Sequence, residues 1–210
     1  MYSMLRRDFL TSTLSAPLAA RAVAAPKLGV DLFSVRSQGW SAFEHLDYCS
    51  KLGAKTVHFS EIRFLGSLDD DHARKVGEHA RRLGIDLEIG MRSICPTSTA
   101  FDKQAGTAEE QLTKVMRAAQ IAGSKLVRAF LGTMADRKTP GGIEARIEDA
   151  VKVLRNLRSR AQDMGLRIAI DNHAGDMQAR ELRQPIEAAG KDVVGAIFDS
   201  GNPSWVLADP

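Results

Sequence analysis

GLRIAIDNHAGD (residues 165–176) and GKDVVGAIFDSGN (residues 190–202) are the two stretches that decide the fold. Each starts at a glycine suited to ending a helix, continues as a short apolar run, and stops at an aspartate, Asp171 or Asp199. A short apolar run of this kind is typical of a buried strand in a parallel sheet. Because the carboxyl ends of parallel strands lie at one edge, we expect both aspartates there, where barrel enzymes place their chemistry.

The rest of the chain repeats the same plan. Segments with helical spacing of apolar residues end at a glycine, and a β-rich run follows within a few residues. These glycines are Gly53, Gly84, Gly123, Gly165 and Gly190. The predicted strands lie near residues 28–35, 56–60, 86–92, 125–131, 167–171 and 194–198, with helices between them, the longest at about 143–164. Strands that alternate with helices predict βαβ units and a parallel sheet.

A closed barrel and an open doubly wound sheet both fit this alternation. The open sheet loses its best support because no G-x-G-x-x-G stretch follows the first predicted strand. Polar side chains at nearly every strand end favour the barrel. They are Arg36, Glu61, Arg92, Asp171 and Asp199. The predicted fold class is therefore α/β, a (β/α)8 TIM barrel of which about six βα units are present.

The composition predicts one globular domain, which we place at residues 26–210. Of the 210 residues, 44% are hydrophobic and 26% are charged, which excludes a disordered or fibrous protein. No run approaches 18 apolar residues, so stable insertion into a membrane is not expected. Cys49 and Cys95 are too few for a disulfide scaffold and are predicted to be buried thiols.

Residues 1–25 differ from the rest and predict an export signal. Arg6 and Arg7 precede a moderately apolar, small-residue stretch that ends at residues 22–25, AVAA. The run RRDFL resembles a twin-arginine signal. The expected partner is the twin-arginine export machinery, and the expected location is the bacterial periplasm. An amphipathic N-terminal helix is the alternative interpretation.

The charge balance argues against nucleic acid as a partner. The chain has 29 basic and 26 acidic residues, net +3, but Arg6, Arg7 and Arg21 against Asp8 account for two of these charges. No basic stripe with interleaved aromatic residues remains, and aromatic residues make up only 6% of the chain. Nucleic-acid binding is therefore not expected.

Asp171 and Asp199, with His173 close by in the sequence, predict either a cation site or a structural role. Carboxylate oxygens suit Mg²⁺ or Mn²⁺, and a neutral imidazole adds a further ligand. The alternative is that the two aspartates cap the following helices or accept hydrogen bonds from turn amides. Spacing alone leaves both interpretations open.

The elements IDNHAGD and IFDSGNP resemble motifs of the xylose isomerase-like TIM barrels, the sugar-phosphate isomerase/epimerase superfamily. Members commonly carry Glu-Asn-His after strand five and Asp-Thr/Ser-Gly-Asn after strand six. The resemblance implies a divalent metal, Mn²⁺, Mg²⁺ or Co²⁺ with Zn²⁺ as a further candidate. The family holds it by Glu, Asp, His and Glu after strands five to eight. Residues 28–202 share this likeness.

Transferred residue by residue, the resemblance makes Asp199 the strand-six metal ligand. It makes Asp171 the strand-five metal ligand and first catalytic base, although Asp171 is one methylene shorter than the usual Glu. It implies substrate contacts for a second group of residues: Glu61, His58, Asn172, His173 and Asn202. Structural alternatives stay open for two of these, since His58 also fits a satisfied core histidine and Glu61 a helix cap.

The chain is shorter than the barrels it resembles. Six predicted strands leave no seventh or eighth, and with them the implied His and Glu ligands are missing. We therefore expect a fragment of a protein of about 250 residues or more, with negligible turnover by itself. Assembly into a homo-oligomer stays open.

The resemblance implies a sugar or sugar-phosphate isomerase or epimerase that moves a proton next to a carbonyl through an enediolate. The expected partner is a small-molecule carbohydrate. A non-catalytic sugar-binding barrel and a metal phosphodiesterase similar to endonuclease IV are the alternatives. Substrate identity is not predicted, because Arg36, Arg92 and Arg128 fit either phosphate contacts or, for at least two of them, structural ion pairs.

Overall fold

The computed structural model describes residues 26–206. The predicted export signal, residues 1–25, therefore lies outside the described part of the chain, as do residues 207–210. Within residues 26–206, no helix combines the length and the apolar character needed to span a bilayer.

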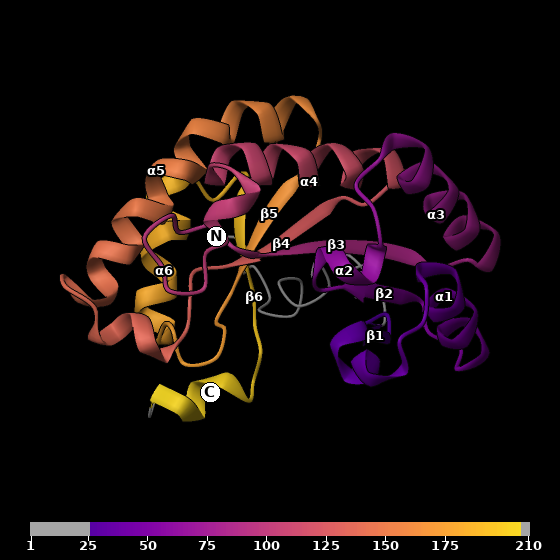
Figure 1. The fold of residues 1–210 in the computed structure, drawn as a ribbon, viewed down its shortest axis with the longest axis horizontal. Coiled ribbons are helices and arrows are strands. Elements are labelled where there is room, and N and C mark those ends of the chain that lie inside the picture. Colours follow the sequence, from indigo (N-terminus) through magenta and orange to yellow (C-terminus); the bar gives the residue numbers. More distant parts are fainter. Residues whose placement is uncertain (1–25, 207–210) are drawn as a thin grey trace, which may run out of the picture.

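Six parallel strands form one sheet, and their order in the sheet is their order in the chain. The strands are β1 (Gly29–Asp31), β2 (Thr56–Phe59), β3 (Asp86–Ser93), β4 (Leu126–Phe130), β5 (Arg167–Asp171) and β6 (Val194–Ile197). Figure 1 shows them along an arc that opens between β1 and β6. A doubly wound sheet reverses its strand order at a switch point. The sequential order therefore confirms the predicted barrel architecture, as a partial barrel of six strands.

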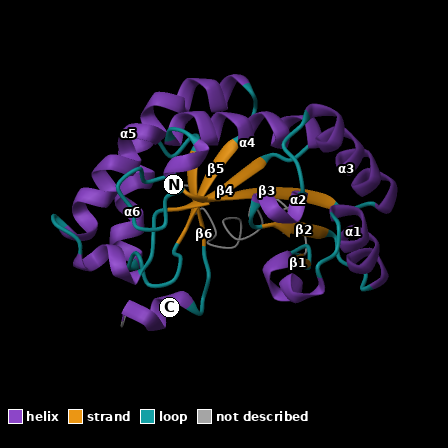
Figure 2. Ribbon diagram, in the orientation of Figure 1, coloured by secondary structure: helices purple, strands orange, loops and turns teal. Residues whose placement is uncertain are grey.

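Helices cover the outer side of this arc (Figure 2). They are α1 (Ala42–Lys51), α2 (Ile62–Leu65), α3 (Asp70–Leu83), α4 (Ala108–Ala122), α5 (Gly142–Asp163) and α6 (Ala179–Ala189), with short 3₁₀ turns η1 (Leu32–Gln38), η2 (Lys103–Ala105), η3 (Met134–Lys138) and η4 (Asn202–Val206). Gly84 and Gly123 end α3 and α4 in the left-handed conformation, with φ of 68° and 87°. Because a residue with a Cβ rarely adopts this conformation, the predicted glycine stops are confirmed there.

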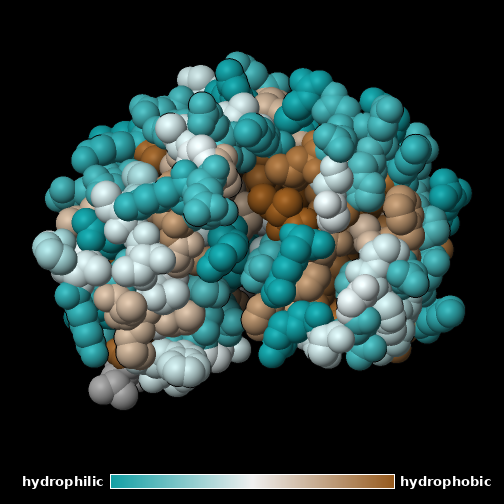
Figure 3. Space-filling view, in the orientation of Figure 1, coloured by the Kyte–Doolittle hydropathy of each residue, from teal (hydrophilic) through white to brown (hydrophobic). Residues whose placement is uncertain are grey.

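The hydrophobic core lies between the sheet and the helices. Val57 and Phe59 of β2 are fully buried, whereas His58 between them is only partly buried, as strand alternation requires. Cys49 and Cys95 are free and buried, as predicted. Figure 3 shows hydrophilic residues over most of one face and a hydrophobic hollow near its centre. The opposite face of each strand, turned away from the helices, is therefore available for side chains of the site.

The first strand is shorter than the sequence predicts, because residues 28–35 do not all extend. β1 ends at Asp31, whose Oδ1 accepts a hydrogen bond from the backbone amide of Phe33 at 2.8 Å. This local bond turns the chain into η1, which contains Arg36. The prediction that Arg36 lies at a strand end is therefore wrong.

Candidate active site

A cavity of about 300 Å³ lies at the carboxyl ends of the strands. The side chains that line it come from elements far apart in the sequence. They include Glu61, Arg128, Asp171, His173, Asp199 and Asn202. The expectation that Asp171 and Asp199 share one pocket agrees with this arrangement, since both also line a neighbouring cavity of about 500 Å³ with His58.

Asp171 is held at the end of β5 by a buried ion pair with Arg128 of β4. The two residues are 5% and 6% exposed, and both Nε (3.1 Å) and Nη2 of Arg128 bond to Asp171 Oδ2. Arg128 Nη1 also donates to the carbonyl oxygens of Ser60 and Met91. Of the two roles left open for Arg128, phosphate contact or structural ion pair, the structure supports the ion pair.

The other carboxylate oxygen of Asp171, Oδ1, is buried and has no hydrogen-bond partner among the described residues. A buried acceptor without a donor costs about 1–3 kcal/mol. The position therefore calls for a partner that residues 26–206 do not supply, such as a water, a substrate hydroxyl or a cation.

Asp199 follows β6 and is oriented by its own turn. Its Oδ1 accepts hydrogen bonds from the amides of Gly201 (2.8 Å) and Asn202 (3.3 Å). The turn-amide role that the sequence left open thus occupies one oxygen. For Oδ2, the structure of residues 26–206 records no hydrogen-bond donor, so this oxygen remains for a ligand.

Asn172 does not lie where a substrate contact was expected. Its Nδ2 donates to the backbone oxygen of Asp199 at 2.9 Å, and its Oδ1 accepts from the backbone amide of Asp199 at 2.8 Å. With both ends of the amide engaged, and the residue lining a different pocket beside α6, Asn172 is a positioning residue for Asp199.

His173 lines the cavity in a defined tautomer. Its Nδ1 lies 3.0 Å from the carbonyl oxygen of Gly132, so Nδ1 carries the proton and donates it. The ring stacks on Phe130, with centroids 3.9 Å apart. Burial lowers the pKa of the imidazole, which favours the neutral ring with an unprotonated Nε2. Nε2 is then the ring nitrogen left to accept a hydrogen bond from a ligand.

Asp176 is a buried carboxyl group beside the site that the sequence did not single out. It is fully buried, and its carboxylate accepts from the amides of Gly132 (3.0 Å) and Met177 (2.5 Å). Burial raises its pKa to about 8 despite these bonds. Asp176 and His173 thus hold the backbone N–H and C=O of Gly132. The position of Asp176 at the end of IDNHAGD was the available signal.

The side chains of Glu61 and His58 line different cavities. Glu61 lines the site cavity and pairs with Arg63 at 2.9 Å; it makes no side-chain cap bond to α2, so the helix-cap alternative is not realised. His58 Nδ1 lies 3.0 Å from Glu88 Oε2 and faces the neighbouring cavity, away from the expected substrate wall. Its partly buried, hydrogen-bonded state matches the alternative of a satisfied histidine.

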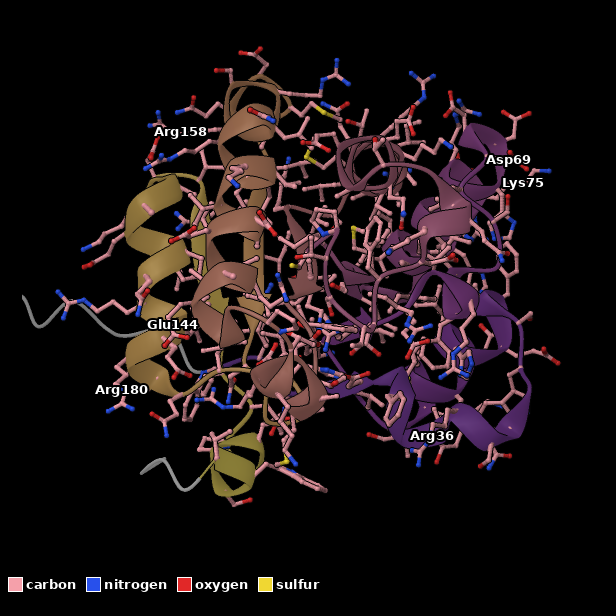
Figure 4. The ribbon with its side chains drawn as sticks, turned by 60° about the vertical axis from the view of Figure 1, so that its left-hand side comes forward. Arg36, Asp69, Lys75, Glu144, Arg158 and Arg180 are labelled. Atoms are coloured by element: carbon pink, nitrogen blue, oxygen red, sulfur yellow. The ribbon has the colours of Figure 1, made fainter. Side chains whose placement is uncertain are left out.

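Arg36 and Arg92 are both exposed. Arg36 packs over the ring of Phe33, 4.2 Å from its centroid, and donates to the Phe33 carbonyl at 2.7 Å. Figure 4 shows its side chain at the surface. Among the described residues, neither arginine forms an ion pair, and neither lines the site cavity.

The residues of the cavity fit part of a divalent cation site. Asp171 Oδ1 has no donor among the described residues, and the recorded bonds to the Asp199 carboxylate go to Oδ1. Carboxylate oxygens are the ligand type that Mg²⁺ and Mn²⁺ prefer. Within residues 26–206, however, no group of three or more His, Cys, Asp or Glu side chains is arranged to hold a metal. The two carboxylates are fewer than a metal site of this kind needs.

Residues 45–208 match the family described as xylose isomerase-like TIM barrel. Among solved structures, the fold is similar to an IOLI protein with a bound zinc atom (TM-score 0.70, 17% identity, 88% of this chain and 66% of that chain). It is also similar to D-psicose 3-epimerase from Clostridium cellulolyticum H10 with D-tagatose (0.65, 14%, 85% and 65%) and to L-ribulose 3-epimerase (0.66, 17%, 88% and 64%).

At these identities the solved structures establish a shared fold. The chain spans between 64% and 66% of the length of the three structures. No curated protein sequence matches the chain.

Proposed function

Because the chain belongs to the xylose isomerase-like TIM barrel family, we propose that its cavity binds a small carbohydrate for isomerisation or epimerisation next to a carbonyl. Two of the similar structures are named as sugar 3-epimerases, and a third holds zinc. These names indicate the chemistry to test. The proposal concerns the site that residues 26–206 contribute to.

One observation carries this proposal. Asp171 and Asp199, which follow adjacent strands, line the same cavity, and the buried Asp171 Oδ1 has no donor. A pair of carboxylates at the carboxyl ends of barrel strands suits both proton transfer and cation binding. A purely structural carboxylate would have its oxygens satisfied by the protein.

Asp171 would hold a divalent cation through Oδ1, and Asp199 through Oδ2. Further ligands would have to come from groups other than residues 26–206. When bound, such a cation polarises a carbonyl and the hydroxyl beside it, which stabilises negative charge that develops on oxygen. The ion is Mn²⁺, Mg²⁺ or Co²⁺, with Zn²⁺ as a further candidate.

The chain's own residues then have separate tasks. Asp171 would accept the proton from carbon at Oδ1, while Arg128 fixes its orientation through Oδ2. A second acid, which the described residues do not supply, would return a proton to carbon. His173 Nε2 accepts a hydrogen bond from a substrate hydroxyl, and the Gly132 carbonyl keeps the required tautomer. Asn202 and Glu61 contact further hydroxyls from the cavity wall.

The test measures bound metal and activity together. After loading with Mn²⁺ and dialysis, wild-type protein is expected to retain the ion, and Asp199→Asn to lose it at least tenfold more readily. Asp163→Asn, the same change on the exposed end of α5, serves as the control. Residues 1–210 alone are expected to show negligible turnover. In a protein extended to eight strands, epimerisation of ketohexoses should disappear with chelator and in Asp199→Asn. Unchanged metal retention in Asp199→Asn would contradict its role.

A second function is favoured by a different feature of the same site. Asp171 already binds a guanidinium, and the described residues hold no group of three metal ligands. A barrel that binds sugar without turnover fits these facts. Sugar binding of equal affinity before and after chelation, with no epimerised product, would identify this binding module.

Export is a separate proposal, which rests on Arg6 and Arg7. Replacing both by lysine should keep the protein in the cytoplasm of an expressing bacterium, because the twin-arginine route reads the guanidinium pair. Cell fractionation of this variant and the parent measures the difference. Equal periplasmic recovery would contradict the proposal.

A further inference from the structure

Negative charge dominates the lining of the site cavity. Among residues 26–206, four carboxylates border it, those of Asp31, Glu61, Asp171 and Asp199, against one guanidinium, that of Arg128. Arg128 is already committed to Asp171 in the buried ion pair. The carboxylates and the guanidinium of this lining therefore sum to a formal charge of three units negative.

A bound divalent cation would not reverse this sign. Two positive charges added to the lining still leave one negative unit. Glu88, in the neighbouring cavity that Asp31, Asp171 and Asp199 also line, adds another carboxylate. A phosphate group carries about −1.5 to −2 charges at pH 7, so the cavity repels it in either metal state.

Two further arginines, Arg63 and Arg36, contact residues of the cavity wall. Arg63 pairs with Glu61 at 2.9 Å, and its side chain is 56% exposed. Arg36 bonds to the Phe33 carbonyl and lies at the surface (Figure 4). Neither side chain lines the cavity. Solvent and salt screen exposed charges of this kind, so they offset little of the field inside.

Aromatic side chains supply the apolar part of the same cavity. Phe33 and Trp205 line it and are 45% and 63% exposed, unusual values for large hydrophobic residues. Their ring faces suit the C–H surfaces of a sugar ring, while the carboxylates and Asn202 suit its hydroxyls. The mixture of apolar faces and hydrogen-bonding oxygens matches a polyhydroxy compound.

We propose that the cavity takes a neutral, unphosphorylated polyol or sugar and discriminates against the same compound carrying a phosphate. This inference rests on the proposed function and names its substrate class. Carboxylates accept hydrogen bonds from sugar hydroxyls, which are donors, and have nothing to donate to phosphate oxygens.

The test compares matched ligands on the full chain. D-fructose and D-fructose 6-phosphate are titrated, with and without Mn²⁺, by calorimetry and by tryptophan fluorescence. We expect the free sugar to bind at least about tenfold more tightly, and the ratio to grow when the salt is reduced from 200 to 10 mM, because screening weakens. Changing the salt leaves a neutral ligand's affinity nearly constant.

Two variants identify the source of the discrimination. Glu61→Gln removes one lining charge with little change in shape and should reduce the ratio severalfold. Glu148→Gln makes the same change on the exposed surface of α5 and should leave the ratio unaltered. If both variants behave like wild type, charge in the lining is not the cause, and the inference is wrong.

The failures of the two proposals differ. If the 6-phosphate binds as tightly as the free sugar, or more tightly, the substrate class is wrong while carbohydrate binding stands. If neither compound nor other ketohexose pairs bind, the proposed function itself is wrong, and the inference is lost with it.

Discussion

The side-chain amide of Asn172 binds both backbone polar atoms of Asp199, at 2.9 Å to its oxygen and 2.8 Å from its nitrogen. A residue at the end of β5 therefore sets where the residue after β6 lies. The relationship joins two adjacent strand ends, and it explains how the exposed Asp199 turn keeps one orientation.

Asn172→Ala should loosen Asp199 and lower affinity for divalent cations. The change leaves two backbone groups without their partner, so we expect about 1–3 kcal/mol less stability and about tenfold weaker Mn²⁺ binding. Urea unfolding and metal titration measure the two effects. Asn156→Ala removes an exposed amide that bonds to Glu109 and is the matched control. Equal Mn²⁺ affinity in both variants would argue against the positioning role.

The Arg128–Asp171 pair should be strongly coupled. Arg128→Met leaves a buried carboxylate without its counter-charge, for which we expect about 3–5 kcal/mol of destabilisation. Adding Asp171→Leu should restore most of this stability, because the unpaired charge is gone. Arg183→Met breaks a surface pair with Glu187 and should cost less than about 1 kcal/mol. A double-mutant cycle with no coupling would contradict the buried pair.

Asp176 should make stability fall as pH rises. Its pKa is raised from 3.8 to about 8, so the folded protein keeps a proton that the unfolded chain releases near pH 4. The resulting stabilisation is complete below that pH and is lost as pH approaches 8. Between pH 6.5 and 8 we expect a loss of about 1–2 kcal/mol.

Urea unfolding at several pH values measures this loss, and Asp176→Asn is the comparison. The variant gives up one acceptor, which lowers its stability by a constant amount, but its pH dependence in this range should be flat. The lowered pKa of His173 adds only a small slope of opposite sign, where the unfolded imidazole titrates near pH 6.5. A parallel slope in wild type and variant would exclude Asp176 as the titrating group.

Two substitutions of His173 should distinguish the structural role of Nδ1 from the ligand-binding role of Nε2. Asparagine places a donor where Nδ1 lies and keeps the bond to Gly132, but lacks anything at Nε2. Glutamine reaches the Nε2 position and gives up the Gly132 bond. We therefore expect His173→Asn to keep most of its stability and lose about tenfold in sugar affinity, and His173→Gln to show the reverse balance. Identical behaviour of the two variants would contradict this division.

Periodicity in the sequence was sufficient for the strand–helix order and for the sheet edge that carries the site. The apolar runs ending at Asp171 and Asp199 predicted both strands and a shared pocket, because strand direction alone determines which ends meet. The end of β1 could not be predicted in the same way. Hydropathy favours extension through residue 35, and a single side-chain bond from Asp31 to the Phe33 amide prevails over it.

The partners within the site were beyond sequence reasoning for a related cause. Arg128 reaches Asp171 because Phe130 and Asp171 are in register, which places Arg128 on the same strand face two positions earlier. Register between residues 43 positions apart is fixed by packing, and no local pattern encodes it. The same holds for Asp176, whose carboxyl group bonds to the amide of Gly132, 44 positions earlier.

Because the strands pair in chain order, the cavity forms only after the first and last units have both folded. Every strand pairs with its predecessor in the chain, so the arc can grow one unit at a time. The cavity nevertheless takes Asp31 from the first unit and Asp199 from the last. Fraying at either margin would abolish it while the middle stays folded, so a bound sugar should slow amide hydrogen exchange in β1 and β6 together.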